Sequence, residues 1–458
     1  MQRGSNYEND TLVLGMSDLA RLRHERPLVL TGGRGVFVFD EHGRDYIEAV
    51  SSFYCVALGY SDEELVEAAT RQLRTLPMYP SAVHRTVPVV LELAERLAAV
   101  APMPNAHVAF ATTGSEANDH LIKFLWYGNG HAGEPERRKI ISRRGSYHGS
   151  TVLLTGLGGS EALARSYGIP TGDFVYVSQP DWPAAAQHGE TEAEYTVRLA
   201  DELRAAIEAA GPATIGAMIA EPISVSAGML PPPAGYFAAV QQVLDGYGIR
   251  LFDDEIVTGF GRTGYMWGSE ALGIAPDCVT CAKGLSSAYQ PISAILMSDD
   301  FYDRLQHASA DDGWFAHGGT YHAHPVAAAV ALKTLEIFDR RDILGHVQRV
   351  IPAWHRALRG LGDHPLVAGT RLFGLAGAVV LRRPGAEASA TRTMKLGGLG
   401  RSAYEAGMEH GVLVRPIGDS IVMAPPLIIT EAEIGELVRR LRAALDEVLA
   451  GLRADTPT

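Results

Sequence analysis

The stretch LFDDEIVTGFGRTG, residues 251–264, places three acidic residues at the end of an apolar run and then breaks into glycines. The run IRLF (249–252) predicts a buried strand because it is short, apolar and partly β-branched. Asp253, Asp254 and Glu255 then follow its carboxyl end. In open parallel sheets, ligands bind beyond the carboxyl ends of the strands. The stretch therefore suggests carboxylates at a binding rim.

A second carboxylate stands in the same kind of place. Glu221 directly follows the apolar run IGAMIA (215–220), which also predicts a buried strand. Helix caps or turn acids remain the plainer interpretation of each carboxylate taken alone. Two strand ends that carry acids favour a shared site at one edge of a sheet.

Short β-branched runs alternate with alanine-rich amphipathic stretches along most of the chain, which is typical of an α/β domain with a mostly parallel sheet. The predicted strands are residues 107–110, 139–142, 174–177, 215–220, 249–252 and 294–297. The predicted helices are residues 64–73, 89–100, 198–210 and 326–338.

The 458 residues exceed one ordinary domain, so a large domain and a smaller one are expected. We expect residues 61–340 to form the large domain. Residues 1–60 and 341–458 then build the smaller α+β domain from both ends of the chain.

The two outer segments have their own patterns. VFVFDEHGRDYIEA (36–49) predicts a hairpin that turns at His42 and Gly43. After residue 340 the pattern predicts a helix, one strand over LFGLAGAVVL (372–381), a polar loop, and a last helix that ends near Leu452.

Composition excludes several classes of protein. The hydrophobic fraction of 47% and the charged fraction of 20% are those of an ordinary globular protein. The net charge of −13, with no basic stripe, argues against nucleic acid as a partner. No apolar run is long enough for a membrane helix, and MQRGSNYEND (1–10) lacks the apolar core of a signal peptide, so we expect a cytoplasmic location.

The three cysteines, Cys55, Cys278 and Cys281, cannot form a disulfide framework, and we expect the last two to be core residues rather than a zinc or redox pair.

Lys283 is a candidate nucleophile. In CVTCAKGLSSAYQPISA (278–294) it stands between an apolar run and a Gly-Ser-Ser turn, where its side chain would be partly buried. Desolvation lowers the pKa of a lysine, and the neutral amine can form a Schiff base. A solvated surface lysine is the alternative for this residue alone.

A phosphate site is suggested by FATTGSEANDHLIKF (110–124), which passes from a strand through Gly114 and Ser115 into a helix. Backbone N–H groups at the start of a helix bind anions. The signal is weak by itself. Together with a Schiff-base lysine and a carboxylate partner for a pyridinium nitrogen, it describes the binding of pyridoxal 5'-phosphate (PLP).

Seven long motifs in one order carry a resemblance to a known family. They are FATTGSEAND, SYHGST, IAEPI, DDEIVTGFGRTG, AKGLSSAYQPISA, HGGTYHAHPVAAA and VLVRPIGDSIVMAPPLIIT. With these motifs the chain resembles the class III aminotransferases of the fold-type I PLP-dependent transferases, and most of all the ω-transaminases that pair amines with pyruvate. The resemblance implies a large domain with a mostly parallel seven-stranded sheet, a smaller domain, and ping-pong transfer of an amino group through pyridoxamine phosphate.

The resemblance implies catalytic roles for two residues. Lys283 matches the lysine that holds the cofactor and moves a proton, and Asp254 matches the carboxylate that keeps the pyridine nitrogen protonated. Ile256 matches the apolar residue on one face of the cofactor ring, and Tyr147 the aromatic residue on the other. The adjacent His148 is expected to orient this turn and to lie in the cofactor site.

The resemblance also implies the remaining cofactor contacts. Gly114 and Ser115 match the phosphate loop, and Glu221 matches a supporting glutamate near the ring hydroxyl. Thr320 matches a threonine that reaches the phosphate of the neighbouring subunit. A homodimer with shared active sites is therefore implied, while the pairing of dimers into tetramers is left open.

Substrate residues follow from the same comparison of motifs. Arg415 matches a mobile arginine that pairs with the carboxylate of a keto acid, although a surface ion pair is the alternative. The family often has a tryptophan where this chain has Tyr54, and an aromatic pair where it has Ala82 and Val83. These departures imply a wider pocket that accepts bulky primary amines.

Several polar residues have a structural interpretation, and other functions remain open. We expect His317, His322 and His324 to be hydrogen-bonded structural groups, so no metal site is predicted, and we expect Arg262 to brace the loop after the acidic residues. The rival functions are an aminomutase or a decarboxylase with the same cofactor, a non-catalytic PLP-fold binding protein, and a metal-dependent enzyme. The physiological amine donor and the preferred keto-acid acceptor do not follow from the sequence.

Overall fold

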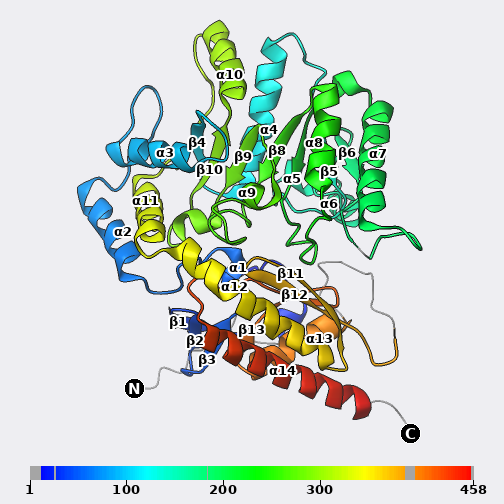
Figure 1. The fold of residues 1–458 in the computed structure, drawn as a ribbon. Coiled ribbons are helices and arrows are strands. Elements are labelled where there is room, and N and C mark those ends of the chain that lie inside the picture. Colours follow the sequence, from blue (N-terminus) through cyan, green and yellow to red (C-terminus); the bar gives the residue numbers. More distant parts are fainter. Residues whose placement is uncertain (1–11, 25–26, 183, 387–397, 455–458) are drawn as a thin grey trace.

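A seven-stranded sheet forms the centre of the fold (Figure 1). This computed structural model describes residues 12–24, 27–182, 184–386 and 398–454. In the sheet, β7 (Ile215–Ala220) and β9 (Cys278–Cys281) are buried along their whole length. Strands covered by helices on both faces are apolar throughout, which is how they read in the sequence. In spatial order the strands are β4 (His107–Ala111), β10 (Ser293–Met297), β9 (Cys278–Cys281), β8 (Arg250–Asp254), β7 (Ile215–Ala220), β5 (Lys139–Arg143) and β6 (Phe174–Val177).

Within this sheet β10 is antiparallel to both of its neighbours, β9 and β4, whereas β9, β8, β7, β5 and β6 pair in parallel. The expectation of a mostly parallel seven-stranded sheet is confirmed. Parallel neighbours end at the same edge, so the loops after β5, β7, β8 and β9 meet there.

Helices cover the sheet, and one of them begins at the predicted anion site. α4 (Gly114–His131) follows β4 directly, and a capping box fixes its start. The Thr113 hydroxyl accepts from the Glu116 N–H at 3.1 Å, while the Glu116 carboxylate accepts from the Thr113 N–H at 3.3 Å. The other helices of this part are α2 (Glu63–Thr75), α3 (Pro88–Val100), α5 (Val152–Leu157), α6 (Glu161–Tyr167), α7 (Glu192–Ala210), α8 (Tyr236–Tyr247), α9 (Gly268–Leu272), α10 (Asp299–Asp312) and α11 (Pro325–Arg340).

Both ends of the described chain build the lower part of the molecule in Figure 1. One sheet holds β1 (Leu30–Arg34), β2 (Phe37–Asp40), β3 (Asp45–Glu48) and β13 (Val412–Leu413), and a second holds β11 (Val367–Phe373), β12 (Ala376–Leu381), β15 (Ser420–Met423) and β14 (Arg415–Ile417). The parallel pairing of β13 with β3 joins the C-terminal segment to the N-terminal one. The exact domain boundaries at residues 60 and 340 stay predictions.

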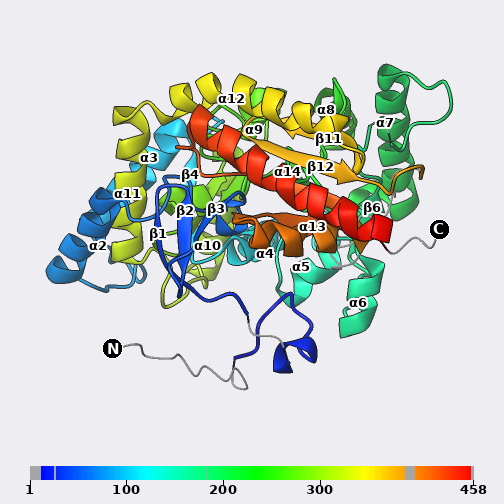
Figure 2. The same cartoon turned by 90° about the horizontal axis from the view of Figure 1, so that it is seen from below.

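Three long helices accompany these sheets: α12 (Ile343–Arg359), α13 (Gly398–Glu409) and α14 (Glu431–Ala454). Figure 2 shows α14 lying between α12 and α13, and it packs against both. The hairpin predicted at residues 36–49 is present as β2 and β3, which pair antiparallel.

The structure corrects the sequence analysis in two places. The single strand expected over residues 372–381 is the antiparallel pair β11 and β12, which turns at Gly374. Gly374 has φ +55°, and a Cβ there would lie 2.5 Å from the Arg262 carbonyl oxygen, so the turn needs glycine. β8 extends to Asp254, so Asp253 and Asp254 belong to the strand rather than following it.

Several elements were not predicted, among them β9, α13 and β15, because they are short or lack a clear period. A strand near Arg415 was expected and is present as β14. Residues 1–11, on which the expectation of no signal peptide rests, lie outside the described residues, as do residues 387–397 of the expected polar loop. None of the helices in the described ranges combines the length and apolar character needed to cross a membrane.

Candidate functional site

The sequence-predicted carboxylates and lysine come together where neighbouring parallel strands end. Glu221 follows β7, Asp254 ends β8, and Lys283 lies two residues beyond β9. These strands are adjacent in the sheet. All three residues line one pocket. The parallel direction of the strands explains why residues far apart in the sequence share this rim.

The alternation of side chains along β8 decides which acid enters the pocket. Successive residues of a strand point to opposite faces, and Asp254 lines the pocket, whereas Asp253 and Glu255 are not among its lining residues. Asp253 and Glu255 are buried behind it. Burial, followed by the neighbouring Glu255, raises the pKa of Asp253 well above its usual value. Asp254 is thus the acid placed to meet a ligand.

Two polar side chains hold the Asp254 carboxylate. Its Oδ2 lies 2.8 Å from His148 Nδ1 and accepts from Asn118 Nδ2 at 2.9 Å, while Oδ1 accepts from the Ile256 N–H at 3.2 Å. An ionised carboxylate only accepts hydrogen bonds, so the proton of His148 belongs on Nδ1. Hydrogen bonds of this kind fix the direction of the carboxylate.

Asn118 is a site residue that the sequence analysis missed. Its Nδ2 also donates to the His148 carbonyl oxygen at 2.7 Å, and its Oδ1 accepts from Thr280 Oγ1 at 2.7 Å. It lies four residues after Gly114 on α4, a spacing that puts both on one helix face. The four-residue spacing between Gly114 and Asn118 in GSEAND is the sequence feature that could have marked Asn118 as a site residue.

The Lys283 side chain enters the pocket from a strained backbone. Lys283 has φ +50°, a left-handed conformation that is uncommon for residues other than glycine. Its Nζ lies 5.6 Å from the centre of the Tyr54 ring. Burial lowers the pKa of Lys283, which favours the neutral amine that a nucleophile or base requires.

Glu221 occupies a second buried position on the rim. Its Oε1 accepts from the Tyr147 N–H at 3.3 Å, and its Oε2 lies 3.7 Å from the guanidinium of the fully buried Arg143. Burial raises the pKa of Glu221. Tyr147 is thereby tied to the strand end, and both residues line the pocket.

Close packing around the start of α4 depends on glycine. A Cβ on Gly114 would lie 2.6 Å from Ile256 Cδ1, so the absence of a side chain lets Ile256 reach across the pocket. A Cβ on Gly149 would lie 2.8 Å from Ser115 Oγ, and Ser115 Oγ accepts from the Ser150 N–H at 3.1 Å. Gly114, Ser115, Gly149 and Ile256 all line the pocket, and Gly149 was not predicted.

Arg415 and two aromatic rings form another part of the pocket wall. The Arg415 guanidinium carbon lies 4.9 Å from the centre of the Phe53 ring and 5.6 Å from that of Tyr54, within cation–π range. Tyr54 is 4% exposed, and burial raises its pKa to about 12, so its phenol stays neutral. Met16 also lines the pocket next to Arg415.

The rest of the wall was not predicted from the sequence. It is mainly apolar and includes Phe53, Ile223, Val225 and Val257. Apolar residues in irregular segments have no period that would mark them as pocket residues.

Three predicted residues lie away from the pocket of their own chain. Thr320, Ala82 and Val83 are exposed and are not among the lining residues. Val83 is 81% exposed and has φ +53°, which is an outlier for a β-branched residue. Large exposed apolar side chains stand near Thr320 in the sequence, at Trp314, Phe315 and Tyr321.

The remaining expectations concern structural groups. Arg262 donates to the carbonyl oxygens of Leu375 at 2.9 Å and Pro425 at 2.7 Å, so it braces the loop after β8 as expected. Cys278 and Cys281 are buried in β9, also as expected. His324 accepts from the Val326 N–H at 3.2 Å and caps α11, and His317 Nδ1 lies 3.2 Å from Lys123 Nζ.

The residues of the pocket fit PLP. A buried carboxylate, a buried amine and the glycine-lined start of a helix surround one space, as a pyridinium, an aldehyde and a phosphate require. His148 Nε2, Glu221 Oε2 and the Tyr54 hydroxyl are buried and make no hydrogen bond with any described residue. Such atoms need polar partners from a ligand or from water.

Comparison with known proteins gives relatives along almost the whole chain. Gamma aminobutyrate transaminase 1, mitochondrial, of Solanum lycopersicum is 39% identical over 424 residues, which cover 92% of this chain and 82% of that protein. The corresponding transaminase 1 of Oryza sativa subsp. japonica is 39% identical over 415 residues, which cover 90% of this chain and 80% of that protein.

Solved structures of ω-transaminases are also similar to this chain. The ω-transaminase of Pseudomonas jessenii in complex with PMP is 37% identical with a TM-score of 0.93, over 97% of this chain and 98% of that chain. A thermostable ω-transaminase variant engineered for the synthesis of enantiopure bulky amines is 38% identical with a TM-score of 0.93, over 96% of this chain and 98% of that chain. Residues 19–445 match the family Aminotransferase class-III. The chain therefore belongs to the class III aminotransferases, which depend on PLP.

Proposed function

We propose that this aminotransferase moves an amino group from a primary amine to a keto acid, with pyruvate as acceptor, in two half-reactions of a ping-pong cycle. The observation that carries the proposal is the composition of one pocket. Lys283, Asp254 and Arg415 line it together with several apolar side chains. The pocket thus combines proton-transfer groups with a carboxylate-binding group and space for an apolar substituent.

The proposed cofactor contacts follow the geometry of the pocket. Asp254 would pair with the ring nitrogen, Ile256 and Tyr147 would pack against the ring, and Gly114 and Ser115 would hold the phosphate. His148 and Glu221 support the ring from the rim. When bound, PLP accepts the electron pair released at the substrate carbon.

Lys283 has two proposed tasks. Its Nζ anchors the cofactor covalently, and once released it removes the proton from the substrate Cα as a general base. The lowered pKa that burial gives Lys283 suits this second task. Because Asn118 and His148 fix Asp254, its charge needs no reorganisation during proton transfer.

Arg415 and Tyr54 form the proposed end of the pocket for a carboxylate. A guanidinium binds a carboxylate with two parallel hydrogen bonds, and the buried Tyr54 hydroxyl has no partner among the described residues. A donor whose amine and carboxylate stand at opposite ends, such as γ-aminobutyrate, would use the same pair. This ω-amino acid is the second candidate donor, supported by the curated relatives.

We further propose a homodimer with shared sites, in the cytoplasm. Thr320, Ala82 and Val83 lie away from the pocket of their own chain, and large apolar side chains near Thr320 are exposed. A partner subunit would cover these side chains. Thr320 would then complete the partner's phosphate site, and the small Ala82 and Val83 would widen the partner's pocket for bulky amines.

Replacing Lys283 by alanine tests the central assignment. We expect turnover to fall by at least about 1,000-fold, because one amine serves as anchor and as general base. Borohydride reduction followed by peptide mass spectrometry should find the cofactor on Lys283 in the wild type and on no lysine in the variant. Lys333→Ala, at a surface ion pair with Glu336, is the control and should keep activity. A reducible link in the Lys283→Ala variant would assign the anchor to another lysine.

The register at the end of β8 is tested by two isosteric changes. Asp254→Asn keeps the shape and removes the charge, so we expect kcat to fall about 100- to 1,000-fold. Asp253→Asn should stay close to the wild type, because Asp253 does not line the pocket and burial raises its pKa, which favours the neutral form. Both are measured as single-turnover rates with saturating amine. The opposite ranking would make Asp253 the partner of the cofactor.

The shared site is tested with mixed dimers in which one subunit carries Lys283→Ala and the other Thr320→Ala. If Thr320 acts across the interface, one of the two sites in such a dimer is wild type. The purified heterodimer should then have about half the wild-type activity at low cofactor concentration. The Thr320→Ala homodimer should bind PLP about 10- to 100-fold more weakly, since a hydrogen bond to a charged group is lost. A heterodimer without any normal site would place Thr320 in its own subunit's pocket.

Arg415→Ala should separate the two half-reactions. We expect the reaction with pyruvate to lose about 2 to 4 kcal/mol of transition-state stabilisation, and the reaction with an amine that has no carboxylate to lose far less. Single-turnover kcat/KM with pyruvate, γ-aminobutyrate and a carboxylate-free amine gives the comparison. Arg382→Ala, at an exposed position, is the control. Equal losses with all three substrates would contradict carboxylate recognition by Arg415.

A further inference from the structure

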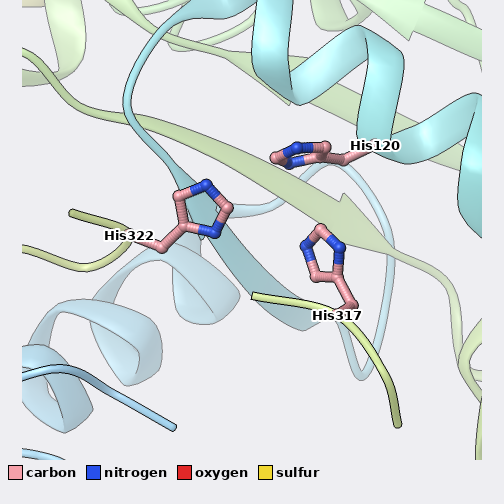
Figure 3. Close-up of side chains that lie close together, drawn as sticks. All are labelled: His120, His317 and His322. Atoms are coloured by element: carbon pink, nitrogen blue, oxygen red, sulfur yellow. The ribbon is translucent and has the colours of Figure 1, made fainter. Parts of the chain in front are cut away.

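Three histidines from two distant segments gather beside the start of α4 (Figure 3). His120 lies on α4, and His317 and His322 lie on the connection between α10 and α11. One ring nitrogen of each lies within 4.8 Å of the corresponding nitrogens of the other two. Figure 3 shows the three imidazole rings turned toward one shared space.

The spacing of the rings fits a single tetrahedral ion. The ring centres are 4.5 Å apart for His120 and His317, 5.0 Å for His120 and His322, and 5.7 Å for His317 and His322. Three imidazoles bound to one Zn²⁺ at about 2.0–2.1 Å and tetrahedral angles place their ring centres about 5 Å apart. Small side-chain rotations would therefore bring the three nitrogens to bonding distance.

The protonation of the three rings also suits a cation. Burial lowers the pKa of His120 to about 4 and of His317 to about 3, and it lowers the pKa of His322 as well. Neutral imidazoles are metal ligands, whereas protonated ones are not. The Nδ1 atom of His120 is buried and makes no hydrogen bond with a described residue. A buried acceptor without a partner is costly unless a ligand or water satisfies it.

Neighbouring residues both position the three imidazole rings and limit their affinity for a cation. A Cβ on Gly319 would collide with the His322 ring, so glycine makes room for this imidazole. The negative charge of Glu116 acts on both His120 and His322. Against this, the exposed Lys123 places its Nζ 3.2 Å from His317 Nδ1 and would repel a cation. Lys123 can turn away into solvent.

We propose that His120, His317 and His322 bind one divalent transition-metal ion of the zinc type, with water in the fourth position. The ion would join α4, which begins at Gly114, to the connection that carries Thr320. It would thereby stiffen the connection from which Thr320 is proposed to reach the partner's phosphate. This consequence rests on the proposed function, whereas the metal site itself does not.

The test uses the PLP-loaded enzyme after removal of metals with a chelator. Titration with Zn²⁺ by calorimetry, and with Co²⁺ by visible absorption, should show one ion per chain and the bands of tetrahedral Co²⁺ bound by nitrogen. His120→Ala and His322→Ala should each weaken Zn²⁺ binding by at least about 100-fold, because one of three ligands is lost. His324→Asn is the matched control, since it leaves the cluster intact and asparagine can still cap α11.

A gain-of-affinity variant keeps the test independent of folding defects. Lys123→Met removes the nearby positive charge and should tighten Zn²⁺ binding. Zn²⁺ should also raise the melting temperature of the wild type but not of His322→Ala, because a ligand that binds only the folded state stabilises it. The transaminase half-reactions are measured separately, so loss of the metal site and loss of the proposed function are distinguishable.

Two results would overturn the proposal. One is a wild-type enzyme that binds no Zn²⁺ at micromolar concentrations, which would leave the three histidines as packing groups, with His317 against Phe124 and Phe315. The other is Zn²⁺ binding that persists unchanged in both histidine-to-alanine variants, which would place the ion elsewhere on the chain.

Discussion

The buried carboxylate of Asp254 is the constraint on which the site depends. A charge in a buried position must be paired and hydrogen-bonded, or it takes up a proton. Asn118 from α4 and His148 from the loop after β5 both contact Asp254 Oδ2. Three elements from separate parts of the sequence must therefore meet within hydrogen-bonding distance. The capping box that sets the start of α4 and the parallel pairing of β5, β7 and β8 make that meeting possible.

The site also requires that the segment after β8 lie close to the start of α4. Ile256, two residues after Asp254, lies against the start of α4, and Gly114 leaves space for its side chain. The backbone of Lys283 is held with a positive φ beside it. Strain of this kind persists where the surrounding structure determines the conformation. Rigid strand ends thus support a few residues in unusual conformations.

The sequence predicts site residues where a charged side chain stands at the end of an apolar run. Asp254, Glu221 and Lys283 could be predicted because each stands at the end of an apolar run, and the structure brings them into one pocket. Asn118 was missed because an amide within a helix looks like a solvated residue. The turn at Gly374 was missed because apolar residues flank it on both sides, so no polar break marks the end of β11.

The difference between Asp253 and Asp254 shows how the fold assigns different roles to neighbouring residues. Both are buried on one strand, yet three hydrogen bonds reach Asp254, whereas Asp253 lies beside the acidic Glu255. Donors favour the charged form of a carboxylate, while burial beside another acid favours the neutral form. Because side chains alternate along a strand, the donors of α4 and of the loop after β5 can reach only one of the two. The chemistry of the pocket is therefore set by the register of β8, because a shift by one residue would turn Asp253 instead of Asp254 toward the pocket.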